Sequence, residues 1–142
     1  MLESILIVDD IPENLSLLHE SLDQAGYQVL VATNGFDAIE IAHRIQPDMI
    51  LLDGSMPEMD GFETCTQLKA SPVTEHIPVI FMTGLTETEH ILKGFQVGGV
   101  DYVTKPLNID EVRARVKTHL LQARLMHQQR QMLDATGSAI LS

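Results

Sequence analysis

The sequence predicts an α/β protein, a doubly wound parallel sheet of five strands with helices on both faces. Short apolar runs alternate five times with segments of helical periodicity, which is the pattern of βα units around a parallel sheet. The runs are almost continuously apolar, as expected for strands that helices cover on both faces. No internal repeat of about 20 to 50 residues is present, which argues against a solenoid. The expected strands cover residues 4–9, 28–33, 49–53, 78–83 and 101–105.

Apolar residues at helical spacing predict the helices between these strands. After the first strand, Pro12 suits a first helical turn and Gly26 suits a helix end. The only cysteine, Cys65, lies on such a stripe, so we expect a packed thiol rather than a reactive one. The stripes consist of Leu15, Leu18 and Leu22; Ala38, Ile41, Ala42 and Ile45; Phe62, Cys65 and Leu68; and Ile109, Val112 and Val116.

The last helix is expected to continue beyond the sheet. The chain of 142 residues is then read as one domain over residues 1–121, followed by a helical linker or tail over 122–142 that leads toward an absent output domain. The helical pattern fades at Gly137-Ser138.

The apolar residues of this tail form a short stripe that a lone domain has nothing left to cover. A frayed end is one interpretation, because isolated helices of this length are marginal in water. The other is a weak two-chain coiled coil that joins two copies as a homodimer. The stripe consists of Leu121, Leu125 and Met132, with Gln128 as an interruption.

Composition limits the partners and the location of the protein. Twenty acidic and nine basic residues give a net charge of -11, which disfavours nucleic acid and anionic membranes as direct partners. No apolar run approaches the roughly 20 residues that cross a bilayer, and the first residues lack the features of a secretory signal. We therefore expect a cytoplasmic protein. The six histidines show no metal-ligand clustering.

Polar residues lie at the same end of four of the expected strands. Asp9 and Asp10 close the first strand, Asp53 the third and Thr83 the fourth, and Lys105 ends the fifth. Each has an ordinary structural explanation, as a helix cap, a turn or a surface residue, but their joint placement at one edge of a parallel sheet predicts a shared pocket. Clustered carboxylates repel one another unless a hard cation such as Mg²⁺ binds between them. A carboxylate can also attack phosphorus, while a hydroxyl and an ammonium contact the oxygens of the phosphoryl group.

The motifs around these residues resemble the receiver domain of two-component response regulators over about residues 3 to 121. The resemblance implies the flavodoxin-like strand order 2-1-3-4-5, with five helices, the last of them extended. It also implies a signalling domain that catalyses only its own phosphorylation and dephosphorylation. The matching stretches are ILIVDDIPEN from Ile5, ILLDGSMPEMDG from Ile50, VIFMTG from Val79 and GVDYVTKP from Gly99.

The resemblance also implies a role for each site residue. Asp53 would accept a phosphoryl group from a sensor histidine kinase or a phosphotransfer protein, and Thr83 and Lys105 would contact the phosphoryl oxygens. Thr83 and Tyr102 would form the switch.

For the metal, Asp10 and Asp53 would bind Mg²⁺, or Mn²⁺ in its place, through carboxylates. Asp9 would bind chiefly through water and Ser55 through its backbone carbonyl. The Lys105-Pro106 peptide bond would be cis.

Three positions near Asp53 and Thr83 bear on the loop after Asp53 and on the lifetime of the phosphate. Gly54 stands where the family usually has a larger apolar residue, which predicts an unusually mobile loop after Asp53. Ser55 and Leu85 occupy positions that influence the lifetime of the phosphate in such domains.

Three other protein classes share part of this pattern. An aspartyl-phosphate phosphatase of the haloacid dehalogenase class would carry an acid where Ser55 stands. A flavodoxin-type carrier of flavin mononucleotide would have its phosphate repelled by Asp9 and Asp10. A receiver-like interaction module that is never phosphorylated is the remaining alternative, although the whole acceptor set is intact.

Overall fold

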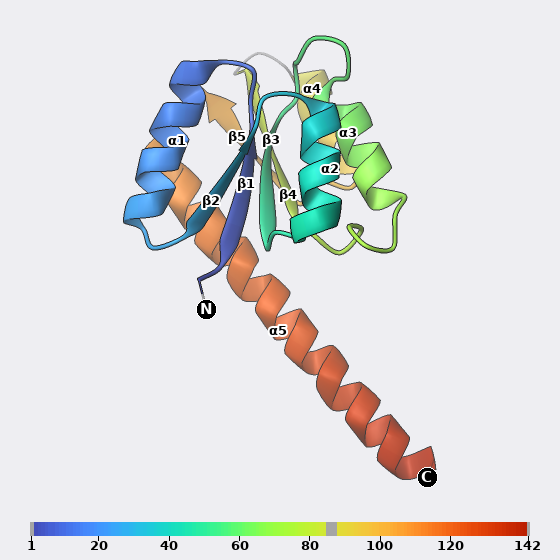
Figure 1. The fold of residues 1–142 in the computed structure, drawn as a ribbon. Coiled ribbons are helices and arrows are strands. Elements are labelled where there is room, and N and C mark those ends of the chain that lie inside the picture. The colour runs from blue at the N-terminus through green and yellow to red at the C-terminus, as the bar shows by residue number, and fades with distance from the viewer. Residues whose placement is uncertain (1, 85–87, 142) are drawn as a thin grey trace.

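The computed structural model describes residues 2–84 and 88–141, with side chains up to residue 133. Its five strands are all parallel and lie in the order β2-β1-β3-β4-β5, which confirms the expected topology (Figure 1). Each strand begins and ends within one residue of its predicted bounds. The elements are β1 (Ser4–Val8), α1 (Pro12–Gln24), β2 (Gln28–Ala32), α2 (Gly35–Ile45), β3 (Met49–Asp53), α3 (Gly61–Lys69), β4 (Val79–Gly84), α4 (Thr88–Gln96), β5 (Asp101–Lys105) and α5 (Ile109–Leu141).

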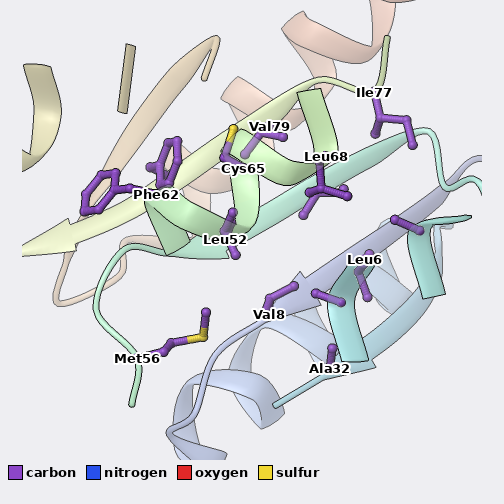
Figure 2. Packing of buried hydrophobic residues seen from close by; sticks show 14 residues of the cluster. Leu6, Val8, Ala32, Leu52, Met56, Phe62, Cys65, Leu68, Ile77 and Val79 are labelled. Atoms are coloured by element: carbon purple, nitrogen blue, oxygen red, sulfur yellow. The ribbon is translucent and has the colours of Figure 1, made fainter. Parts of the chain in front are cut away.

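Helices cover both faces of the sheet, as the apolar strands predict. Successive side chains of a strand point to opposite faces, so each apolar run serves two cores. In β1, Leu6 and Val8 join the cluster under α2 and α3, whereas Ile5 and Ile7 join the one under α1 and α5. Figure 2 shows the first cluster, in which Cys65 is fully buried, as expected. Burial raises the pKa of the Cys65 thiol to about 11.

The last helix is much longer than the sheet that it covers. Val112, Val116 and Leu120 are buried against the sheet, and beyond them α5 extends from the domain as a single helix (Figure 1). The prediction that the helical pattern fades at Gly137-Ser138 is wrong, because α5 continues to Leu141. A single glycine costs a helix only about 1 kcal/mol, and no proline interrupts this segment.

The stripe expected on the tail is exposed. Leu121, Leu125 and Met132 have relative exposures of 48%, 51% and 70%, so nothing in the described part of the chain covers them. Among the described residues, no helix has both the length and the apolar character needed to cross a membrane.

Candidate functional site

Three carboxylates meet at the carboxyl ends of the adjacent strands β1 and β3. Val8 pairs with Leu52 in the sheet, so the aspartates that follow these positions lie side by side. Asp9 has no exposed surface, Asp53 is 3% exposed, and Asp10 faces solvent. One carboxylate oxygen from each of the three lies within 4.8 Å of the others. The structure thus brings together the acidic residues that the sequence singled out.

Asp9 is held by donors from the start of α1. Its Oδ1 accepts a hydrogen bond from the backbone amide of Ile11 at 2.9 Å, and its Oδ2 accepts one from Nδ2 of Asn14 at 3.1 Å. Sequence reasoning gave Asn14 no role. The available signal was its place in the first turn of the helix that follows the acidic pair, where its side chain can reach back to Asp9.

Lys105 lies between the two buried carboxylates. Its Nζ is 3.3 Å from Oδ2 of Asp9 and 3.2 Å from Oδ1 of Asp53. Although burial opposes its charge, Asp53 and Asp9 together raise the pKa of Lys105 above its usual value, so it remains an ammonium. The Lys105-Pro106 peptide bond is cis, as the resemblance implies.

Burial raises the pKa of Asp53 to about 6, which is unusually high for an aspartate. The neighbouring charge of Asp9 acts in the same direction, whereas the Ser55 amide and Lys105 oppose the shift. The Ser55 amide donates to Oδ1 of Asp53 at 3.1 Å. Among the described residues, both contacts of the Asp53 carboxylate therefore fall on Oδ1, and Oδ2 has no hydrogen-bond donor.

The loop after Asp53 is packed rather than loosely attached. The Gly54 amide donates to the Met82 carbonyl at 3.2 Å, and the Gly54 carbonyl accepts from the Gly61 amide at 3.1 Å. A side chain at Gly54 would approach the Phe62 ring to 3.1 Å, so this ring occupies the space that a larger residue would fill. The mobility expected from Gly54 stays a prediction. Its packing role was missed, because it depends on Phe62, eight positions along the chain.

Gly61 opens α3. A Cβ atom at this position would overlap the backbone carbonyl of Asp53. The start of α3 can therefore lie directly against the end of β3 only because Gly61 has no side chain.

Thr83 lies near the end of β4, next to the acidic cluster in the strand order. It is 3% exposed and pairs in the sheet with Thr104, the neighbour of Lys105. Among the described residues, the resting Thr83 hydroxyl makes only a long contact, 3.5 Å, to the Gly84 carbonyl. Leu85, which the resemblance linked to phosphate lifetime, lies outside the described residues.

Tyr102 is half-buried on β5, between α4 and α5. Its ring meets the Phe95 ring edge-on at 6.2 Å, and the guanidinium of Arg115 lies 5.9 Å from its centre. Packing on α4 is the arrangement expected of an aromatic switch residue at rest.

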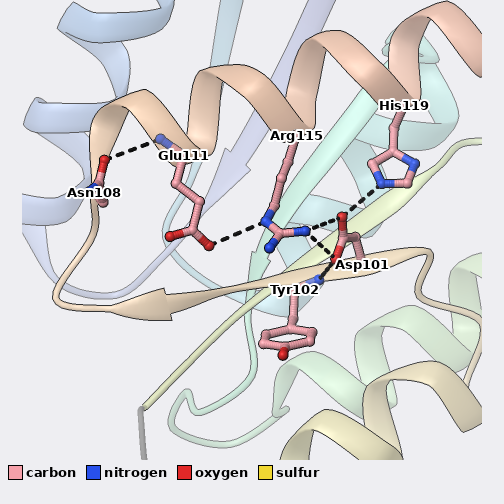
Figure 3. A network of polar contacts seen from close by, with 6 residues as sticks. All are labelled: Asp101, Tyr102, Asn108, Glu111, Arg115 and His119. Atoms are coloured by element: carbon pink, nitrogen blue, oxygen red, sulfur yellow. Dashed lines mark hydrogen bonds and ion pairs between the residues drawn. The ribbon is translucent and has the colours of Figure 1, made fainter.

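A polar network that the sequence did not reveal fixes the backbone beside Tyr102 (Figure 3). The Asp101 carboxylate accepts from Arg115 and from His119, each at 2.9 Å, and from the Tyr102 amide at 2.8 Å. Burial opposes the ionisation of Asp101, but these donors outweigh it and hold its pKa below the ordinary value. The network ties β5 to α5 beside Tyr102.

The acidic cluster has the chemistry of a site for a hard cation. It places three carboxylates around a single ammonium, so negative charge remains in excess. Both oxygens of Asp9 are occupied by donors, whereas the exposed Asp10 carboxylate remains available as an oxygen ligand beside the Asp53 carboxylate. The residues present therefore fit a divalent ion such as Mg²⁺.

Comparison with known proteins identifies this arrangement. The family model of the response regulator receiver domain matches residues 5–117. A probable cyclic di-GMP phosphodiesterase of Vibrio cholerae is 46% identical over 121 residues, a stretch that covers 85% of this chain but 27% of that protein. The chain spans about a quarter to a half of the length of the first curated relatives that it matches.

Solved structures share the fold as well. A crystal structure of a putative response regulator from Chloroflexus aurantiacus is 30% identical, with a TM-score of 0.83, over 85% of this chain and 99% of that one. The receiver domain of a sensor histidine kinase from Pseudomonas aeruginosa is 27% identical, with a TM-score of 0.78, over 84% and 98% of the two chains. That crystal structure has a magnesium ion coordinated in its active-site cleft.

Proposed function

Because the chain belongs to the response regulator receiver family, we propose that it signals through a phosphoryl group accepted on Asp53. The observation that carries this proposal is the state of the Asp53 carboxylate. It is buried, its Oδ1 is fixed by the Ser55 amide and Lys105, and its Oδ2 has no donor among the described residues. A carboxylate nucleophile requires an oxygen that is held in place but accepts no hydrogen bond.

In the proposed reaction, Oδ2 of Asp53 forms a bond to phosphorus as the P–N bond of a phosphohistidine on the donor breaks. The bonding electron pair leaves with the imidazole nitrogen of the donor. Lys105, kept protonated by Asp53 and Asp9, contacts a phosphoryl oxygen and offsets its charge. Thr83 donates its hydroxyl to another phosphoryl oxygen, because its resting contact is weak and easily given up. The domain catalyses only this transfer and the later loss of the phosphate.

We propose that Asp10, Asp53 and the backbone carbonyl of Ser55 hold Mg²⁺, for which Mn²⁺ can substitute. Asp9 acts on the ion through water, since its two oxygens already accept hydrogen bonds. The bound ion would neutralise charge between the carboxylates and the phosphoryl group. The magnesium ion in the related Pseudomonas aeruginosa receiver supports this assignment.

The switch in this proposal links Thr83 to Tyr102. When Thr83 moves toward the phosphoryl group, Tyr102 turns inward and leaves its contact with Phe95 on α4. The Asp101 network holds the backbone of β5 in place during this change, so that the side chain moves rather than the strand.

We propose a sensor histidine kinase or a phosphotransfer protein as the phosphoryl donor. Residues 1–121 form the receiver, and 122–142 form a linker toward an output domain, with a homodimer through α5 as the means of transmission. The exposure of Leu121, Leu125 and Met132 supports this pairing. Direct contact with nucleic acid or membrane is not part of the proposal, and the cytoplasmic location stays a prediction from the sequence.

Phosphorylation with a small donor tests the acceptor. The full chain, incubated with acetyl phosphate and Mg²⁺, should gain one phosphoryl group that is stable in acid and labile in base. Asp53→Asn should gain none, whereas Asp60→Asn, which changes the cap of α3, should still react. Intact-protein mass spectrometry reports each adduct. The same adduct on Asp53→Asn would refute the assignment, and no adduct on the wild type would favour an interaction module that is not phosphorylated.

A further inference from the structure

Asn14 shares one oxygen of Asp9 with Lys105. Its Nδ2 lies 3.1 Å from Oδ2 of Asp9, and Nζ of Lys105 lies 3.3 Å from the same oxygen. The other oxygen of Asp9 accepts from the Ile11 amide at 2.9 Å. Asp9 has no exposed surface, so these three donors replace the water that would otherwise solvate its charge.

The three donors differ in how firmly they are held. The Ile11 amide is part of the backbone that enters α1. The backbone amide of Asn14 donates to the Ile11 carbonyl at 3.1 Å, which fixes the point from which the Asn14 side chain extends. Lys105 is different. Its long side chain ends between two carboxylates and is equally close to Asp53. Of the three donors, Lys105 has the longest side chain, and it already contacts a second carboxylate, so it can change partner with the smallest rearrangement.

We propose that Asn14 is a positioning residue that keeps Asp9 in place when Lys105 turns from the two carboxylates to the phosphoryl group on Asp53. This inference rests on the proposed function, because it requires Lys105 to contact the phosphoryl group. When Lys105 leaves, Asn14 still donates to Oδ2 of Asp9. Without Asn14, that oxygen would stay buried with no donor from the protein, and the loss of a donor to a buried charged acceptor is costly.

The role of Asn14 should therefore depend on the state of the site. In the resting protein, Lys105 stays in contact with Oδ2 of Asp9, and this contact compensates when the side-chain amide of Asn14 is removed. In the phosphorylated protein it no longer does so. A residue that merely stabilised α1 would affect both states equally, which gives the inference a distinct experimental signature.

The test compares the full chain as wild type, Asn14→Ala and Asn34→Ala. Asn34 is a matched control, because it is also an asparagine at a helix start, but its side chain accepts from the Asp37 amide instead of contacting the acidic cluster. Calorimetric titration gives the affinity for Mg²⁺ at rest. Fluorine NMR gives the affinity for beryllofluoride, a phosphoryl mimic, in the presence of saturating Mg²⁺.

For Asn14→Ala we expect beryllofluoride affinity to fall by about tenfold or more, since a lost hydrogen bond to a buried charge has that order of effect. Mg²⁺ affinity should change by less than about threefold, given the compensation by Lys105. Asn34→Ala should lower the melting temperature and leave the ratio of the two affinities unchanged.

An unchanged ratio in Asn14→Ala would overturn the inference and leave the proposed function intact. Failure of the wild type to bind beryllofluoride would instead overturn the proposed function. If Asn14→Ala does not fold, Asn14→Ser replaces it in the same comparison. Serine is too short to reach Asp9 as Asn14 does, but it is well tolerated near a helix start.

Discussion

Replacement of Asp53 by asparagine should reveal how much stability the buried, charged Asp53 carboxylate costs the folded protein. In the folded protein the pKa of Asp53 is raised from 3.8 to about 6, chiefly because burial disfavours the charged form. The folded state therefore holds this proton more tightly than the unfolded chain does. The contribution of Asp53 to stability is complete below pH 3.8 and is lost as the pH rises through about 6.

The size of the effect follows from the two pKa values. The difference between 3.8 and about 6 corresponds to roughly 3 kcal/mol, at about 1.4 kcal/mol for each pH unit. Asparagine does not titrate. The free energy of unfolding of Asp53→Asn, relative to wild type, should therefore rise by roughly 3 kcal/mol between about pH 3 and pH 8 when no metal is present.

Urea denaturation followed by circular dichroism, over this pH range and with a chelator, measures the difference. Asp23→Asn is the control, because Asp23 is an exposed carboxylate on α1, away from the acidic cluster. Adding Mg²⁺ near pH 7 should narrow the gap, since the ion binds the ionised wild-type site. If Asp53→Asn and wild type differed by a constant amount at every pH, the burial argument for Asp53 would be refuted.

Three further predictions concern the loop, the metal and the tail. Gly61→Ala should destabilise the protein by about 1–3 kcal/mol in urea unfolding and slow phosphorylation by acetyl phosphate, because the new methyl group meets the Asp53 carbonyl; wild-type values would contradict this packing. Millimolar Mg²⁺ should raise the melting temperature of the wild type but not of Asp10→Asn, in which a ligand is lost, and an equal rise in both would exclude Asp10 as a ligand. The 142-residue chain should self-associate in analytical ultracentrifugation, more strongly after phosphorylation, whereas residues 1–120 should not. Monomers in all samples would make the tail an inert linker.

The sequence alone determined where the strands lie and which residues reach the carboxyl edge of the sheet. A strand buried on both faces needs an unbroken apolar run, and a polar residue that ends such a run marks the point where the chain leaves the core. These signals are local, so Asp9, Asp53 and Thr83 could be placed from a few neighbouring letters. The strand order was less direct, because it came from resemblance to a family rather than from periodicity.

Only the tertiary structure decided how these residues interact. The contact of Asn14 with Asp9 depends on the entry angle of α1, and the bond between Asp101 and His119 depends on how α5 docks on β5. The raised pKa of Asp53 likewise requires burial and a nearby Asp9 charge, both of which arise from strand pairing. Periodicity records which face of an element is apolar, but it does not record which side chains of two docked elements meet. The identities of the site residues were therefore readable from the sequence, whereas their partners and their electrostatics were not.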